Sequence, residues 1–249
     1  QLLFNAADII VVGRFGSENS LAAVGSTSSL INLLVNLFVG LAIGCNVLTA
    51  RYQGARKESD VSETVHTSIA LSIVSGITMG IIGILVAAPV LTLMETPEEV
   101  LPLSTLYMRI YFLGMPFIML YDFSSSILRS SGDSRRPLYA LIAAGIINTG
   151  LNLILVIVFH LGVSGVAIAT VVSNIVSSGI LFYILLHEQE PIRVRLSGLS
   201  IDWGELKKIL IIGVPAGLQG MVFSLANVCI QSMINSFGSN AIAGSAAAL

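Results

Sequence analysis

Four polar residues that lie inside apolar stretches have the chemistry to bind a small cation or a proton together. Asp8 interrupts the run "QLLFNAADIIVV" with a carboxylate. Asn148 and Asn152 lie four residues apart in "NTGLN", which places both amides on one face of a helix. Thr170, in "GVAIATVVS", adds a hydroxyl group. Because hard cations prefer oxygen ligands, these residues predict an ion-binding site whose only charge comes from Asp8.

A purely structural role is the alternative for each of these residues. A carboxylate inside a bilayer is costly unless it is protonated, solvated or paired with a cation, and a protonated Asp8 could simply bond between helices. Small polar side chains such as Asn148 and Asn152 commonly form hydrogen bonds across helices. Because Asp8 lies in a different stretch from the asparagines, we favour a shared site.

Three further residues, Asn5, Tyr107 and Arg109, are candidates for the wall of a central cavity. Asn5 lies one turn before Asp8, and the other two share one apolar stretch. We expect Tyr107 to reach the group around Asp8 and Arg109 to face the cavity.

The stretches that position these residues are long enough to cross a membrane. Charged residues make up 10% of the chain and hydrophobic ones 55%, whereas a soluble domain carries about 25% charged residues. Four ranges contain no Asp, Glu, Lys or Arg: 21–50, 69–94, 137–186 and 209–249. Each exceeds the roughly 20 residues that a spanning helix needs. The sequence therefore predicts an all-α polytopic membrane protein.

Turn signals divide these ranges into expected spans near 1–13, 21–48, 62–88, 101–128, 137–160, 163–187, 207–236 and 239–249. The first span is too short to cross, since about 13 residues rise about 20 Å against a core of about 30 Å. The last span is also short. We therefore expect a fragment that is truncated at both ends.

Basic residues predict the orientation of the chain in the membrane. Ten of the 12 Lys and Arg residues fall in one alternating set of loops and span ends, and Arg14 alone falls in the opposite set. Because cytoplasmic loops carry an excess of Lys and Arg, the ten-residue set is predicted to be cytoplasmic. Its members are Arg51, Arg56, Lys57, Arg129, Arg135, Arg136, Arg193, Arg195, Lys207 and Lys208.

A short internal repeat predicts two related halves. The tripeptide Phe-Gly-Ser occurs at 15–17 and again at 237–239, each time at an outer turn and six spans apart. An even period corresponds to a parallel repeat, as in several transporter folds. We therefore expect a first six-helix lobe over 1–190, a cytoplasmic linker over 191–206 and the start of a second lobe over 207–249. Asp8 aligns with Ile230, so the acid belongs to the first lobe only.

Other residues are predicted to serve packing. The pairs Gly40/Gly44, Gly76/Gly80 and Gly213/Gly217 allow close helix contacts. Asn32 and Asn36 are expected to bond between helices, and Pro116 and Pro215 to kink theirs. His66, His160 and His187 fall at span ends and are interpreted as interfacial residues.

Three segments resemble the multidrug and toxic compound extrusion (MATE) transporters, closest to the bacterial branch. They are "NAADIIVVGRFGSENSLAAVGS", "ARYQGARKESDVSETVHTS" and "ILRSSGDSRRPLYALIAAGIINTGLNLILVIVFHLGVSGVAIAT". The resemblance runs through essentially the whole chain. It implies twelve helices in two six-helix lobes around a central cavity, and export of cationic or amphipathic organic compounds in exchange for Na⁺ or H⁺.

The resemblance also implies roles for particular residues. Asp8 matches the coupling acid of the first helix, and Asn148, Asn152 and Thr170 match a polar cluster on the fifth and sixth helices. Tyr107 is a looser match. Many family members carry a second carboxylate where this chain has Asn152, which leaves Asp8 as the sole acid of the cluster.

The leading function is therefore a multi-pass antiporter in the bacterial cytoplasmic (inner) membrane. The alternative is a lipid-linked oligosaccharide flippase of related architecture, which would need several basic residues in its cavity where only Arg109 is available. The spans contain no nucleophile–base pair or metal-ligand spacing, so we expect no enzyme, no cofactor besides the coupling ion, and no metal beyond Na⁺ at Asp8. The expected partners are a small organic substrate and the bilayer, without nucleic acid, and the full-length protein is expected to be monomeric.

Overall fold

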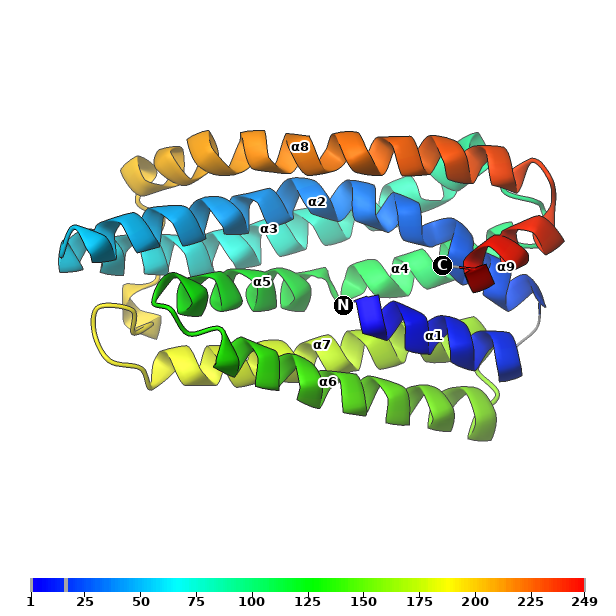
Figure 1. Ribbon diagram of the computed structural model, residues 1–249, viewed down its shortest axis with the longest axis horizontal. Helices are drawn as coiled ribbons and strands as arrows, with labels where there is room; N and C mark the ends of the chain where they lie inside the picture. Colours follow the sequence, from blue (N-terminus) through cyan, green and yellow to red (C-terminus); the bar gives the residue numbers. More distant parts are fainter. Residues whose placement is uncertain (1, 16–17, 249) are drawn as a thin grey trace.

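The computed structural model describes residues 2–15 and 18–248, and these form a bundle of helices (Figure 1). The helices run roughly along one common axis. In chain order they are α1 (Leu2–Phe15), α2 (Glu18–Gly54), α3 (Glu58–Leu93), α4 (Leu101–Leu113), α5 (Met115–Ser130), α6 (Arg135–Leu153), the π-helix η1 (Ile154–Val158), α7 (Gly162–Leu186), the 3₁₀-helix η2 (Leu196–Gly198), α8 (Trp203–Asn235) and α9 (Ser239–Ala248).

The helices agree with the expected spans. Within the described residues, five helical segments are long and apolar enough to cross a membrane, and the bent pair α4 and α5 makes a sixth. The five are Asn19–Gly54, Glu58–Leu93, Arg135–Val158, Gly162–Leu186 and Trp203–Asn235. The predicted fold class is therefore confirmed. Helices α1 and α9 have 14 and 10 residues, fewer than a full crossing requires.

The span over 101–130 is bent by 50° between α4 and α5. Pro116 lies in the first turn of α5. Its missing N–H leaves the carbonyl of Phe112 without its helical partner. That carbonyl packs instead against α3, since a Cβ placed on Gly80 would lie 2.9 Å from the Phe112 oxygen. The kink predicted at Pro116 is thus present as a complete break at Gly114.

The connections between helices gather at two ends of the bundle (Figure 1). One end holds the connections 55–57, 131–134 and 187–202, and the other holds 94–100, 159–161 and 236–238. All ten basic residues that predict the orientation lie at the first end, which we call the basic end. The structure thus places them together on one side of the bundle, and the assignment of that side to the cytoplasm remains a prediction.

Helix α8 lies along α2 and makes its closest contacts at glycines (Figure 1). A Cβ on Gly40 would lie 2.2 Å from the backbone nitrogen of Gly217, and one on Gly44 would lie 2.5 Å from the Ile209 carbonyl. The Asn36 amide also donates a 2.7 Å hydrogen bond to Ser224 across the same seam. The predicted packing role of these glycines and of Asn36 is confirmed.

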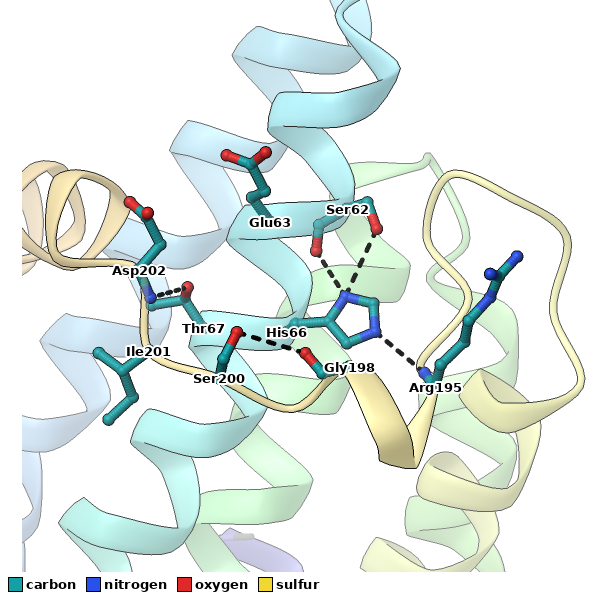
Figure 2. Close-up of a pocket in the computed structure, with 9 residues that line it drawn as sticks. All are labelled: Ser62, Glu63, His66, Thr67, Arg195, Gly198, Ser200, Ile201 and Asp202. Carbon is teal, nitrogen blue, oxygen red and sulfur yellow. Dashed lines mark hydrogen bonds between the residues drawn. The ribbon is translucent and has the colours of Figure 1, made fainter.

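The segment before α8 is fixed to α3 by hydrogen bonds (Figure 2). The backbone N–H of Arg195 donates to Nε2 of His66 over 3.0 Å, and Nδ1 of the same ring lies 2.7 Å from the Ser62 carbonyl. Further along, the backbone N–H of Asp202 donates to the Thr67 hydroxyl. His66 is 8% exposed because it joins the linker to the bundle, and its position at the membrane interface stays a prediction.

Apolar residues fill the bundle and also cover its outside. Two buried clusters form the interior, one around Met108 and Phe112 and one around Phe123 and Leu128. Large aliphatic side chains such as Leu85 and Ile146 are exposed on the outer surface. An apolar exterior of this kind is what lipid contact requires, because the bilayer core offers no polar partners.

Candidate functional site

Three helices bring the predicted polar residues together. Asp8 lies in the middle of α1, Asn148 and Asn152 lie in the last two turns of α6, and Thr170 lies in α7. The four side chains are almost completely buried, with exposed fractions of 0% for Asp8, Asn148 and Asn152 and 5% for Thr170. The spacing of the asparagines works as expected, since one face of α6 presents both amides to α1 and α7.

The four side chains form a closed ring of hydrogen bonds. The Asn152 amide donates to Oδ1 of Asp8 over 2.6 Å, and the Thr170 hydroxyl donates to Oδ2 over 3.1 Å. The Asn152 amide also donates to Oδ1 of Asn148 over 3.2 Å. The amide of Asn148 completes the ring by donating to the Thr170 hydroxyl over 3.3 Å.

The ring supplies the Asp8 carboxylate with donors but with no positive charge. Within the described part of the chain, neutral amides and a hydroxyl are the groups that bond to it. Hydrogen bonds from neutral donors offset only part of the cost of burying an ionised carboxylate. A proton or a cation must therefore accompany Asp8 whenever the site is closed to water.

The asparagine that donates to Asp8 also carries an oxygen that is available to a cation. Oδ1 of Asn152 is buried and has no hydrogen-bond donor within the described structure. Buried polar atoms without partners are rare in native proteins. Together with the Asp8 carboxylate and the Thr170 hydroxyl, this amide oxygen completes a set of hard oxygen ligands suited to a small cation.

The remaining predicted residues lie around this group in different ways. Tyr107 of α4 is buried, and no hydrogen bond joins it to Asp8 in the described structure. Arg109 lies on the exposed face of α4 with Leu106 and Leu113 and forms no ion pair with any described residue. Asn5 falls in α1, but its side chain lies outside the described residues.

Sequence reasoning missed two features of the site. The polar line on α7 continues with Asn174, whose amide donates to the Thr170 carbonyl over 2.8 Å. Its position four residues after Thr170 was the signal that could have found it. The π-helix η1 begins two residues after Asn152 and ends the helix that carries the asparagines. Short π segments are often found at functional sites.

The fold and the site define a multi-pass helical membrane protein with a buried carboxylate that is held by neutral side chains of two neighbouring helices. The family model described as MatE matches residues 1–154. The chain is 33% identical over 242 residues to "Probable multidrug resistance protein YoeA" of Bacillus subtilis (strain 168), covering 94% of this chain and 52% of that protein. The chain therefore belongs to the MATE family of transporters.

Further comparisons agree with this assignment. "Probable multidrug resistance protein YpnP" of the same organism is 29% identical over 245 residues, covering 98% of this chain and 54% of that protein. A solved structure described as the inward-facing conformation of a multidrug resistance MATE family transporter matches with a TM-score of 0.91 and 29% identity. It covers 99% of this chain and 56% of that chain. The chain thus spans about half the length of the relatives that it matches.

Proposed function

We propose that the full-length protein is a secondary active antiporter that exports cationic or amphipathic organic compounds in exchange for Na⁺ or H⁺. Membership of the MATE family supports this proposal, as do the multidrug resistance names of the relatives. The observation that carries the coupling role is the Asp8 carboxylate, which is buried without a countercharge among the described residues and accepts from Asn152, whose oxygen has no partner.

The hydrogen-bond ring suggests how the ion state of Asp8 is linked to helix positions. Asp8 belongs to α1, whereas all of its donors belong to α6 and α7. When Asp8 loses its proton or cation, the bare charge favours a conformation in which water reaches it. Neutralisation favours the packed arrangement of α1 against α6 and α7. Binding and release of the ion thereby shift the equilibrium between two conformations.

The larger organisation is part of the same proposal. Residues 1–190 form the first lobe, 191–206 the cytoplasmic linker and 207–249 the start of the second lobe, with the substrate cavity between the lobes. The protein acts in the bacterial cytoplasmic membrane as a monomer and needs no cofactor besides the coupling ion. Asn5, Tyr107 and Arg109 are proposed to border the cavity.

The test compares Asp8→Asn with the unchanged full-length protein in vesicles. The measurement is efflux of a fluorescent organic cation such as ethidium, driven by an imposed Na⁺ or H⁺ gradient. Asp8→Asn should abolish gradient-driven efflux and leave expression and thermal stability nearly intact. The amide removes the charge and keeps nearly the same shape; its oxygen can still accept from Asn152, and its NH₂ group can donate to the Thr170 hydroxyl.

A matched control is Thr149→Ala, which changes the residue next to Asn148 on the exposed side of α6 and should leave transport unchanged. Normal efflux by Asp8→Asn with an unchanged ion requirement would refute the coupling role. Transfer of a lipid-linked oligosaccharide, without efflux of ethidium, would favour the flippase alternative.

A further inference from the structure

A pocket at the basic end lies between α2 and α8 and has a volume of about 500 Å³. Three basic residues line it: Arg51 from the last turn of α2, Lys57 from the turn before α3, and Lys208 from the second turn of α8. Aliphatic side chains form its other wall, chiefly Ile211 and Ile212, above the buried Leu48. No acidic residue is among the described residues that line it.

The polarity of the pocket changes in the same direction along both helices. Helix α2 runs toward the basic end, so Leu48 lies one turn deeper in the bundle than Arg51. Helix α8 runs away from the basic end, so Ile211 lies deeper than Lys208. The cations therefore gather at the level of the connecting loops, and the aliphatic wall extends toward the middle of the membrane span.

The basic side chains differ in how firmly they are held. Lys208 donates 2.7 Å hydrogen bonds to Oε1 of the buried Glu205 and to the Tyr52 hydroxyl, which fixes its position. Lys57 forms an exposed ion pair with Asp60 over 3.3 Å, a contact of little strength. Arg51 is exposed and has no ion pair with any residue that the structure describes. Two of the three cations are thus available to a ligand.

This availability contrasts with other arginines at the same end. Arg136 is paired with both Asp133 and Glu188, and Arg195 is paired with Glu190. Those positive charges are already neutralised by protein carboxylates. An excess of basic residues on one side of a membrane protein is general, whereas an acid-free pocket that joins them to an aliphatic wall is a specific feature.

We propose that this pocket binds the phosphate-bearing headgroup of an anionic phospholipid, with an acyl chain along Ile211 and Ile212. Basic pockets between transmembrane helices on the cytoplasmic side suit anionic headgroups. The Arg51 guanidinium matches the paired oxygens of a phosphate, and Lys57 adds a second cation. A soluble phosphate would use the cations but not the aliphatic wall. A cationic substrate would be repelled.

A lipid in this position bridges the helices. Arg51 and Lys57 flank the turn between α2 and α3, whereas Ile211 belongs to α8. Helix α8 is otherwise joined to α2 by the glycine contacts and by hydrogen bonds such as that from Lys208 to Tyr52. A ligand that binds the packed state stabilises it by mass action. The bound phospholipid should therefore raise the stability of the seam between α2 and α8, whatever compound the protein transports.

The test uses the full-length protein in a neutral detergent and measures its melting temperature during titration with phosphatidylglycerol, phosphatidylcholine or inorganic phosphate. We expect phosphatidylglycerol alone to raise the melting temperature. Arg51→Gln and Lys57→Gln should each weaken its apparent affinity about five-fold, and the double variant about 25-fold, since each basic residue near an anionic lipid surface contributes a comparable increment. Native mass spectrometry should show fewer retained phosphatidylglycerol molecules on the double variant.

Arg135→Gln is the matched control, because it removes an exposed basic side chain from the same end but outside the pocket. It should respond to phosphatidylglycerol as the unchanged protein does. The proposal is wrong if the double variant responds like this control, or if phosphatidylcholine or inorganic phosphate stabilises the protein equally well. These measurements do not depend on transport, so they are independent of the antiporter proposal.

Discussion

Asn152 links Asp8 to Asn148 and determines how many charges the site contains. Its amide nitrogen donates to both Asp8 and Asn148, and its oxygen is left without a donor. A carboxylate at this position would add a second negative charge beside Asp8 and raise the affinity for a cation. An amide supplies an oxygen ligand without a charge, so Asp8 alone sets the charge of the site.

We predict that Asn152→Ala weakens the ion dependence of transport without eliminating transport. The variant loses a 2.6 Å hydrogen bond to Asp8 and the unpartnered oxygen. Loss of the oxygen removes a potential Na⁺ ligand, so the apparent affinity for Na⁺ should fall. Loss of the N–H donor removes about 1.5–3 kcal/mol of stabilisation from the ionised carboxylate, so a coupling proton should be bound about ten-fold more tightly. Efflux measured against Na⁺ concentration and against pH checks this. An unchanged ion dependence would assign Asn152 to packing alone.

At this scale the sequence predicts which residues meet but not how they bond. The polar interruptions of apolar runs and the four-residue spacing were enough to bring together Asp8, Asn148, Asn152 and Thr170. Which way each amide group points depends on the hydrogen-bond ring that side chains of three helices form together. A local sequence pattern does not contain that information. The hydrogen bond to His66 was not predicted for a similar reason, because its donor is the backbone of Arg195, more than a hundred residues away.

At the scale of the helices, α2 and α8 pack closely because glycines, which have no side chain, form their contact. The Gly40 and Gly44 backbone lies against Gly213 and Gly217, so the two helices approach more closely than any larger residue would permit. Close approach of this kind lets van der Waals contact and backbone dipoles stabilise helix pairs in a bilayer, where the hydrophobic effect does not.

We predict that Gly40→Ala destabilises the full-length protein by about 1–3 kcal/mol, the usual cost of overpacking. The added methyl group would lie 2.2 Å from the Gly217 nitrogen, and neither backbone can move aside without separating the helices. Gly179→Ala is the control, because a Cβ there meets no atom within 4 Å and alanine favours the helix. Thermal unfolding in detergent measures both. Equal melting temperatures for the two variants would contradict the packing role.

The expected spans match the helices to within a few residues at most ends, because long apolar runs and turn residues are local signals. The break at Gly114 was only partly predicted: Pro116 indicated a kink, whereas its size depends on the packing of Phe112 against Gly80. The π-helix η1 was not predicted, since the run "ILVIV" also fits an ordinary α-helix. Tertiary packing decides such details.

For the molecule as a whole, the two ends of the bundle differ in charge, and this difference predicts its orientation. A cysteine at Ser134 should be labelled by a membrane-impermeant reagent from the cytoplasm, and one at Glu98 from outside. Both positions are exposed, and they lie at opposite ends. The native Cys45 and Cys229 are replaced by alanine beforehand. Labelling in the reverse pattern would overturn the orientation.

In the internal repeat, the Gly16–Ser17 part of the first copy lies outside the described residues. Its second copy forms the turn between α8 and α9, where Gly238 has a φ of 92° that favours glycine.

The contacts that hold α8 against the bundle should keep it in place even if the chain is cut before α8. Contacts hold α8 near both of its ends, where Glu205 accepts a hydrogen bond from Tyr52 and Asn235 donates one to the Met94 carbonyl. The connection at Gln189 is exposed and carries none of these contacts. We predict that the protein can be produced as two polypeptides divided after Gln189, which assemble in the membrane and copurify through a tag on either piece. Failure to copurify would mean that the peptide bond, rather than the helix seam, keeps the two parts together.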